Sequence, residues 1–383
     1  MNSKDCVKAV LNFEPAPYVP YGEYAIDSDT VERIIGHETY LRAKARTQTA
    51  LWEGRRDEVV QSLKEDMVTL YKKLDCIDIV NLMSEACGLV PPKDHIPEKP
   101  KKIADGTWED KKGRIYKYSS ITRDITMIHD PDRWDREYTP EEFHFDENSM
   151  NPPDPSCFEV IDHVVDQFKE DKFIISYAGR EAGLVLLGGM ERGLTEYLTD
   201  PDVVQAAIDY ETRLGNYEDA FFIRDDIDAI FWGQDFAYNT GPLINPDIFY
   251  EMVLPSLKAR VENVKKHNVY VFKHCCGNTT ALSSLFVQAG YDCYQSIQKQ
   301  AGMDLRNLRE IYGTEMCLWG GVDVSTLING TMQDVRTETK ESLEIARQGG
   351  MILGSSHSIA TGCNYDNFMA MLEVISNDRK QTR

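Results

Sequence analysis

Residues 269–297 read VYVFKHCCGNTTALSSLFVQAGYDCYQSI, and this stretch contains the unit from which the fold is built. Apolar, β-branched and aromatic runs at 269–275 and 292–297 each predict a strand. Between them, Asn278 or Thr279 can cap a short amphipathic helix. The stretch therefore predicts a strand–helix–strand unit, which is the connection that two parallel strands require.

The same alternation runs along most of the chain. Several of the short apolar runs are apolar on successive residues, which is typical of strands covered on both faces. The predicted strands are 18–23, 76–81, 173–178, 229–234, 269–275, 292–297, 316–321 and 351–356. Eight such runs alternating with helices predict an α/β fold of the (β/α)8 TIM-barrel type. A doubly wound open sheet is the alternative, but no GxGxxG motif follows the first strand to support it.

One stretch, residues 88–155, departs from this pattern because it is rich in proline and poor in helical runs. Within it, residues 107–118 (TWEDKKGRIYKY) predict a β-hairpin that turns around Lys112-Gly113. We interpret the stretch as an insertion after the second strand of a single domain spanning 1–383. Loops at the C-terminal end of a barrel usually build the substrate mouth, so we expect the insertion to form part of that mouth or a lid.

The composition disfavours several classes of protein. The chain has 42 Lys and Arg against 63 Asp and Glu, and its net charge of −21 makes nucleic acid an unfavourable partner. No run approaches the ~20 apolar residues of a membrane helix, and the first residues show no apolar signal-peptide core. We therefore expect a cytoplasmic protein without a membrane anchor. The nine cysteines have no regular spacing, which favours free thiols or metal ligands over disulfides.

The strongest chemical signal is the sequence KHCCG at 273–277, where the fifth predicted strand ends. Residues two apart on a strand point to one side, so His274 and Cys276 can share a site while Cys275 points away. The loop after the eighth strand adds Cys363, and one imidazole with two thiolates suits Zn²⁺ with a fourth position open. Two alternatives are a buried histidine with structural thiols and no metal, or a zinc site that only ties strand ends together.

These motifs resemble those of the uroporphyrinogen decarboxylase superfamily, and within it the zinc-dependent methyltransferases that work with corrinoid proteins. HCCG at 274–277 with TGC at 361–363 is similar to their HxC…C zinc motif. DFAYNTGPLINPDIFYEMVLP at 235–255 and WGGVD at 319–323 also resemble the superfamily, and the resemblance extends over about 170–375. It implies a TIM barrel that binds one zinc ion and exchanges a methyl group with a corrinoid.

The decarboxylases of the superfamily match this chain less well. They hold a porphyrinogen that carries many carboxylates, using an N-terminal Arg-rich segment and an Asp near the end of the second strand. Here residues 13–25 (FEPAPYVPYGEYA) contain no Lys or Arg, and residues 81–85 (NLMSE) offer no clear matching Asp. A pocket for many carboxylates without a basic cluster is electrostatically poor. We therefore expect methyl transfer and not decarboxylation.

By resemblance, two directions of methyl transfer are open. Zinc either binds the heteroatom of a methyl donor, or binds a thiol that accepts the methyl group from methyl-corrinoid. Aromatic side chains at or near the predicted strand ends favour an aromatic donor: Tyr18, Tyr21, Tyr24, Tyr177, Phe231, Trp232, Phe236, Tyr238, Tyr294 and Trp319. We expect demethylation of a methoxylated aromatic compound, although aromatic residues in barrel strands mostly serve as core.

The predicted strand ends and the resemblance together nominate the residues of the site. The residues expected to be catalytic are His357, Glu181 and Asp235. Those expected to contact substrate are Tyr21, Tyr177, Arg180, Tyr238, Asn239, Gln295, Gln298 and Trp319. Glu181 is equally explained as a helix cap, and Arg180 as the partner of an acid at the barrel rim.

The fourth zinc ligand and the corrinoid are not supplied by recognisable motifs. Relatives often place a Glu after the sixth strand as a zinc ligand, but this chain has Gln295 and Gln298 there. The chain also has no DxHxxG corrinoid motif, so we expect the corrinoid to arrive on a partner protein. The sequence is compatible with a homodimer.

Overall fold

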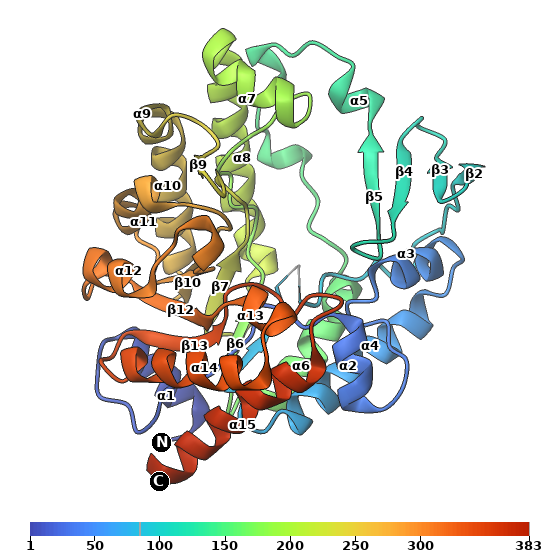
Figure 1. Ribbon diagram of the computed structural model, residues 1–383. Helices are drawn as coiled ribbons and strands as arrows, with labels where there is room; N and C mark the ends of the chain where they lie inside the picture. The colour runs from blue at the N-terminus through green and yellow to red at the C-terminus, as the bar shows by residue number, and fades with distance from the viewer. Residues whose placement is uncertain (84–85, 383) are drawn as a thin grey trace.

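The computed structural model describes residues 1–83 and 86–382 and shows a barrel of parallel strands surrounded by helices (Figure 1). Its strands are β1 (Ile79–Asn81), β6 (Phe173–Ser176), β7 (Ala229–Trp232), β10 (Tyr270–His274), β11 (Cys293–Gln295), β12 (Cys317–Val322) and β13 (Met351–Ser355). They are hydrogen-bonded in that order, and all neighbours are parallel. The predicted barrel fold is confirmed. Ser84 and Glu85, part of the stretch without a matching Asp, lie outside the described residues.

The first predicted strand makes no ladder of its own, but it closes the barrel. The amide of Leu353 in β13 donates to the Pro20 carbonyl at 2.8 Å, and the amide of Gly22 donates to the Leu353 carbonyl at 3.0 Å. On the other side, the amide of Asp78, just before β1, donates to the Tyr21 carbonyl at 2.8 Å. Pro20 has no amide hydrogen, which explains an isolated bridge where a continuous strand is predicted. We call residues 20–22 the closing segment.

The barrel wall is apolar on both sides, because alternate residues of each strand point inward and outward. One buried cluster, inside the barrel, includes Ile79, Phe173, Phe231, Phe272, Cys293, Trp319 and Ile352. Val7 and Val10 of α1 (Ser3–Leu11) join this cluster, so α1 covers one end of the barrel. A larger cluster on the outside packs the strands against the helices. At the C-terminal strand ends, the inward positions of β10 and β11 hold His274 and Gln295 instead.

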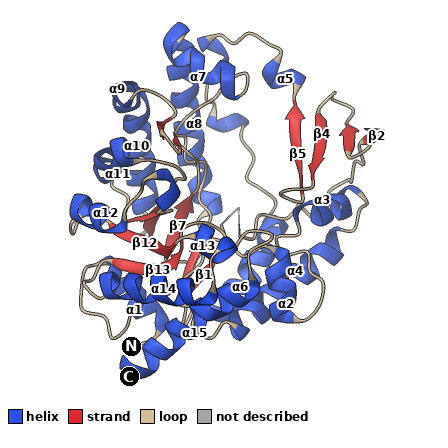
Figure 2. Ribbon diagram, viewed as in Figure 1, coloured by secondary structure: helices blue, strands red, loops and turns tan. Residues whose placement is uncertain are grey.

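Helices cover the outside of the parallel sheet (Figure 2). Besides α1 and the short helix of the insertion, the helices of the chain are α2 (Ser28–Ile35), α3 (Lys44–Trp52), α4 (Arg56–Lys73), α6 (Glu159–Phe168), α7 (Met190–Thr199), α8 (Pro201–Phe222), α9 (Pro246–Ile248), α10 (Leu254–Lys265), α11 (Ser283–Ala289), α12 (Leu305–Tyr312), α13 (Val324–Asn329), α14 (Met332–Ala346) and α15 (Tyr365–Thr382). α11 is the helix predicted between the two strands quoted first. Among the described residues, no helix has the length and apolar character needed to cross a membrane.

The insertion forms a separate antiparallel sheet, drawn at the right of Figure 1. Its elements are β2 (Lys101–Ala104), β3 (Thr107–Glu109), β4 (Ile115–Ser119), β5 (Asp124–His129) and the short helix α5 (Pro131–Trp134). β3 pairs with β4 across the Lys112-Gly113 turn, so the predicted hairpin is confirmed. Trp52 of α3 packs against Trp108 and Tyr116, with ring centroids 5.6 Å apart in both pairs. These aromatic contacts anchor the sheet to the helical layer.

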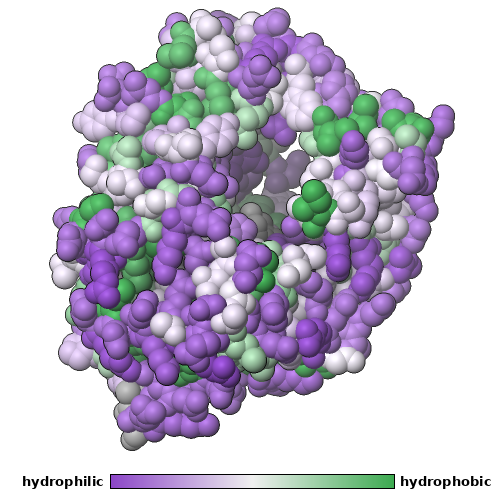
Figure 3. Space-filling model, in the orientation of Figure 1, coloured by the Kyte–Doolittle hydropathy of each residue, from purple (hydrophilic) through white to green (hydrophobic). Residues whose placement is uncertain are grey.

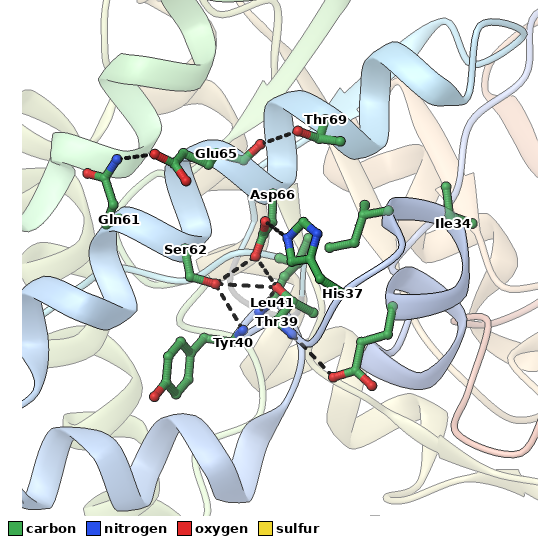
Figure 4. A network of polar contacts seen from close by, with 12 residues as sticks. Ile34, His37, Thr39, Tyr40, Leu41, Gln61, Ser62, Glu65, Asp66 and Thr69 are labelled. Carbon is green, nitrogen blue, oxygen red and sulfur yellow. Dashed lines mark hydrogen bonds and ion pairs between the residues drawn. The ribbon is translucent and has the colours of Figure 1, made fainter.

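A network of polar side chains fastens the segment before α3 to α4 (Figure 4). The carboxylate of Asp66 accepts hydrogen bonds of 2.6 Å from both Thr39 and Ser62, and it lies 2.8 Å from Nε2 of His37. The hydroxyl of Ser62 accepts a hydrogen bond of 3.1 Å from the amide of Tyr40. These contacts fix the path of the chain between α2 and α3.

Figure 3 shows that the surface is hollowed between the barrel and the four-stranded sheet. The loop that follows β13, red in Figure 1, runs along the edge of this hollow. The insertion therefore stands on the far side of an open space from the barrel wall.

Candidate metal centre

The candidate site begins at the end of β10, where the chain turns after Cys276. Gly277 has a φ of +84°, and a Cβ added there would lie 2.6 Å from the carbonyl oxygen of Tyr238. Only glycine fits this close approach without strain. Tyr238 belongs to the hairpin of β8 (Ala237–Tyr238) and β9 (Gly241–Pro242), and its carbonyl accepts from the amide of Asn278 at 2.8 Å. The glycine thus lets the hairpin after β7 lie against the loop that carries Cys276.

Three side chains with metal-binding atoms converge at this end of the barrel. His274 and Cys276 lie on the same side of the strand end, with Nε2 of His274 3.1 Å from Sγ of Cys276. His357, from the loop after β13, places its ring centroid 5.7 Å from that of His274. One ligand atom from each of the three lies within 4.8 Å of the others. His274 is only 3% exposed, while the other two are half-buried and reachable from the mouth.

Burial sets the protonation of this trio. It lowers the pKa of His274 to about 4, although the Asp235 carboxylate acts in the opposite direction. It also lowers the pKa of His357. Burial raises the pKa of the Cys276 thiol well above its ordinary range, and Asp235 adds to that rise. At neutral pH the imidazoles are therefore neutral, which is their metal-binding form, and the thiol keeps a proton that an incoming cation must displace.

Two polar side chains hold His274 and Cys276 in place. Oε1 of Gln295 is in hydrogen-bond contact with Nδ1 of His274, and Nε2 of Gln295 donates to the carbonyl of Ser355 at 3.3 Å. Oδ1 of Asp235 accepts from the amide of Cys276 at 2.6 Å and lies 3.9 Å from Nε2 of His274. Asp235 is therefore at the trio, as the sequence predicts, whereas Gln295 lies behind a ligand and is fully buried.

The chemistry and spacing of the trio fit a zinc ion. Imidazole nitrogen and thiolate sulfur are its usual ligands, and three protein ligands with one open position form a typical catalytic zinc site. With Zn–N near 2.0 Å and Zn–S near 2.3 Å, a tetrahedral centre places nitrogen and sulfur about 3.5 Å apart. The observed separation of 3.1 Å between His274 and Cys276 needs only a small opening to reach that value.

Comparison with known proteins bears on the family. The sequence model of uroporphyrinogen decarboxylase (URO-D) matches residues 157–377, which is more than half of the chain. The chain belongs to the uroporphyrinogen decarboxylase family. The superfamily predicted from the sequence is thereby confirmed. No curated protein matches the sequence.

A solved structure agrees with the fold of this uroporphyrinogen decarboxylase family member. A methyltransferase from Methanosarcina mazei is similar with a TM-score of 0.63 and 18% sequence identity, over 98% of this chain and 99% of that chain. A putative vitamin-B12-independent methionine synthase from Listeria monocytogenes is more distant, with a TM-score of 0.46 and 10% identity over 95% and 96% of the two chains. The first likeness shows that the barrel and its insertion belong to a known overall fold.

Cys363, predicted as a zinc ligand of this family member, lies outside the trio. Its Sγ is 3.8 Å from the carbonyl oxygen of Leu327 in α13, and the residue is 9% exposed. The loop before it is held by Asp27, which accepts from the amide of Thr361 at 2.8 Å. The structure therefore brings His357, and not Cys363, to the other two ligands. The rule of alternating strand residues predicts where a strand side chain points, but it gives no direction for a loop residue.

Glu181, predicted to be catalytic, lies on the outer side of the barrel wall. Its Oε1 is 2.7 Å from Nζ of Lys273 and accepts from the hydroxyl of Tyr291 at 2.7 Å. Lys273 also donates to the carbonyl of Gln234 at 2.7 Å. Because Lys273 precedes His274 on the same strand, the two side chains point in opposite directions. The position of Glu181 is structural and does not support a catalytic role.

Several residues predicted to contact substrate instead pack in the core or form ion pairs. Tyr21 and Trp319 are fully buried, Tyr21 in the outer cluster and Trp319 inside the barrel. Arg180 forms ion pairs with Glu211 and Glu218 of α8, which is the alternative that the sequence left open. Tyr177, just after β6, packs against the outer cluster. The strand ends therefore do not direct these residues to one place: Trp319 fills the barrel interior, Tyr21 and Tyr177 pack in or against the outer cluster, and Arg180 is held by α8.

The remaining predicted contacts lie at the mouth. Tyr238 is 51% exposed on the β8–β9 hairpin, and Asn239 next to it is exposed too. Gln298 accepts a hydrogen bond of 2.7 Å from the amide of Gly277 and is half-buried. Together with Asp235, whose side chain is 51% exposed, they offer polar and aromatic contacts beside the trio.

Two further residues at the trio were not nominated from the sequence. The ring of Tyr24 stacks on that of His274, with centroids 4.1 Å apart. The hydroxyl of Ser296 lies 3.7 Å from Sγ of Cys276, and its φ of +92° is strained for a residue other than glycine. Tyr24 appeared only as one of many aromatic residues, and a serine gives no sequence signal for a left-handed backbone.

Proposed function

We propose that the protein is a zinc-dependent methyltransferase that moves a methyl group from a methoxylated aromatic donor to the corrinoid of a separate protein. The observation that carries this proposal is the convergence of His274, Cys276 and His357 within 4.8 Å at the C-terminal strand ends. Catalytic groups of TIM barrels gather at that end. Membership of the family and a fold shared with a methyltransferase are in line with it.

The neighbourhood of the trio argues against porphyrinogen decarboxylation. A substrate with many carboxylates needs several cationic partners. Residues 13–25 contain no Lys or Arg, and this stretch forms the wall of the barrel beside His274. The tyrosines of the stretch, Tyr18, Tyr21 and Tyr24, are at most 8% exposed. Within this stretch the ring of Tyr24 stacks on His274, so the wall beside the trio carries an aromatic ring and no cationic side chain, which suits an aromatic methyl ether better than a polycarboxylate.

The ligand set favours an ether donor over a thiol acceptor. A bound zinc ion supplies a Lewis acid that polarises the heteroatom carrying the methyl group. One thiolate and two neutral imidazoles leave the centre with a net positive charge, whereas a second thiolate would cancel it. A positive centre stabilises the negative charge that a departing phenolate oxygen acquires, and this barrier is the main difficulty in cleaving an ether.

The residues beside the trio hold the substrate and control protons. Asp235 is the exposed carboxylate that contacts the Cys276 loop, so we assign it to accept a hydrogen bond from a hydroxyl group of the donor. Tyr238 offers an exposed ring at the rim for the aromatic part of the donor. Gln298 holds the turn at Gly277 through the hydrogen bond described above and so keeps Cys276 in place.

The third ligand in this proposal is His357, with Cys363 as the alternative. The two are distinguished by the zinc content of variants purified without added metal. His357→Ala should lose zinc, and Cys363→Ala should retain it. The reverse result would show that the loop held by Asp27 moves to deliver Cys363 when the metal binds.

The corrinoid partner must approach the trio from the open side. The hollow between the barrel and the insertion provides that access (Figure 3). We propose that the insertion, residues 88–155, forms part of the mouth that receives the donor or the partner.

The decisive test is methyl transfer in solution. Protein loaded with zinc is mixed with cob(I)alamin and a panel of methoxyaromatics, methylamines and methyl thiols, and methylcobalamin formation is followed by absorbance. Methoxyaromatics should methylate the cobalt, and Cys275→Ala should behave like the wild type because Cys275 points away from the trio. No bound zinc, or methylation by a different donor class only, would refute the proposal as stated.

A further inference from the structure

Gln295 occupies a position that links the candidate metal centre to the barrel wall. β10 and β11 are neighbours, and their register places Gln295 directly beside His274. The next inward residue of β11 toward the other end, Cys293, lies in the cluster inside the barrel. The side chain of Gln295 is therefore inside the barrel, fully buried, and next to the imidazole on the side away from Cys276.

The orientation of the Gln295 amide is decided by its second partner. Its Nε2 lies 3.3 Å from the backbone carbonyl of Ser355, and a carbonyl oxygen can only accept a hydrogen bond. The NH₂ group of the amide must therefore face Ser355. Oε1 then faces Nδ1 of His274, and an amide oxygen also only accepts. The proton of this contact must come from the imidazole, so Nδ1 of His274 carries it.

A neutral imidazole with its proton on Nδ1 has a free lone pair on Nε2. In this site Nε2 is the nitrogen that faces Sγ of Cys276, at 3.1 Å. The carboxylate of Asp235, 3.9 Å from Nε2, is beyond the reach of a hydrogen bond that would favour a proton there. Both sides of the ring thus favour the same tautomer.

We propose that Gln295 is a positioning residue that fixes His274 in its Nδ1–H tautomer and so presents the Nε2 lone pair for metal binding. The metal-binding half of this inference rests on the proposed function, while the tautomer is a property of the metal-free protein. The residue predicted to contact substrate therefore acts through the histidine, from behind it. A neutral amide in this position orients the imidazole without adding the negative charge that a carboxylate would bring.

The tautomer can be read directly by NMR of metal-free protein labelled with ¹⁵N-histidine, in long-range ¹H–¹⁵N correlation spectra near neutral pH. His274 should show a protonated Nδ1 and an unprotonated Nε2. Gln295→Met keeps the length of the side chain but removes the acceptor, so His274 should shift toward the Nε2–H form. Gln295→Glu keeps an acceptor and should keep the Nδ1–H form.

A matched control is Gln298→Met. Gln298 lies three residues beyond Gln295, just after β11, and its Oε1 accepts from the amide of Gly277 and not from a histidine. This variant should leave the tautomer of His274 unchanged. The signals of His274 are assigned as those that disappear in His274→Gln.

Zinc affinity, measured by competition with a chromophoric chelator, provides a second readout. Removing the partner of a metal-ligating histidine weakens metal binding by about 10–100-fold, so Gln295→Met should lose that much and Gln295→Glu should not. Wild-type affinity and an unchanged tautomer in Gln295→Met would overturn the inference. If that variant does not fold, an Nε2–H tautomer in Gln295→Glu would overturn it. Zinc binding with the expected tautomer but no methyl transfer would refute the proposed function alone.

Discussion

Two neighbouring residues of β10 lead to very different surroundings. Lys273 points outward, where Glu181, Tyr291 and the Gln234 carbonyl surround its ammonium group, and the ring of Phe236 lies 3.9 Å away. His274 points inward, where its Nε2 lies 3.1 Å from the thiol of Cys276 and 3.9 Å from the carboxylate of Asp235. Both are almost fully buried.

The comparison suggests a different role for each side of the barrel wall: the outer side stabilises the fold, and the inner side carries the candidate site. A buried charge needs partners, and on the outer side the chain itself supplies them all. On the inner side His274, Cys276 and His357 converge with the Asp235 carboxylate beside them, and we propose that a cation completes this group. Buried polar groups therefore occur on both sides of the wall. The candidate site is identified by metal-binding atoms, such as Nε2 of His274, that face one another.

The largest expected effect comes from the inner side. His274→Ala and Cys276→Ala each remove a ligand, so zinc content should fall and methyl transfer to cob(I)alamin should drop by about 1,000-fold or more. The unfolding temperature of the metal-free protein should change little by comparison. Metal analysis and circular dichroism on the same samples check both statements. Full activity without bound zinc would remove the contrast between the two sides.

The outer side should respond in stability. Glu181→Gln leaves the Lys273 ammonium buried without its counter-charge, which should lower the free energy of unfolding by about 3 kcal/mol. Zinc affinity should stay at the wild-type value. Denaturant unfolding measures the first quantity and chelator competition the second.

A double variant provides the control for that experiment. Lys273→Met with Glu181→Leu removes both charges and should be less destabilised than Glu181→Gln alone, because no charge remains unpaired. A strong loss of zinc binding in Glu181→Gln would instead show that Glu181 contributes to the metal site.

A pH dependence comes from Glu23, which lies next to the closing segment. Burial raises its pKa from 4.5 to about 7, although hydrogen bonds from Ser355 and Tyr21 act against the rise. The folded state then holds a proton that the unfolded state releases, so stability should fall by about 3 kcal/mol as the pH rises from about 4.5 to 7, and level off above that. Unfolding measured across this range should show the slope, and Glu23→Gln should reduce it.

The smallest effect is expected at Cys275, between the two ligands. Its buried Sγ accepts a hydrogen bond of 3.1 Å from the amide of Phe236, outside the trio. Cys275→Ala should cost about 1–2 kcal/mol of stability and leave zinc and methyl transfer intact. Equal damage from Cys275→Ala and Cys276→Ala would mean that the strand does not direct them to opposite sides.

The sequence predicts the barrel because strand and helix periodicities are local properties. Seven of the predicted strands form as ladder strands, and the eighth region lacks one because Pro20 cannot donate. The pairing of His274 with Cys276 was also predictable, since it follows from alternation within one strand. The insertion was recognisable from its prolines and from the hairpin signal at Lys112-Gly113.

The rest of the site depends on contacts between distant segments. Whether His357 or Cys363 reaches the trio is decided by how Asp27 holds their common loop, and no local pattern encodes this. The ion pair of Glu181 with Lys273 was not predictable, because the two residues are far apart in the sequence. Gln295 was recognised as a site residue, but its role depends on Ser355, which belongs to another strand.

The closing segment has a mechanical consequence for the whole molecule. Local unfolding starts where a structure has the fewest stabilising contacts. In this barrel the closing segment is joined to its neighbours by only a few of the backbone hydrogen bonds of the described residues, around Pro20 and Gly22. We expect the amide protons of the closing segment to exchange with solvent faster than those of β12. Tyr24 lies just beyond the closing segment, and its ring stacks on that of His274. Local opening of the closing segment would therefore displace Tyr24 and widen the barrel mouth for a bulky substrate, while the other strands keep their structure.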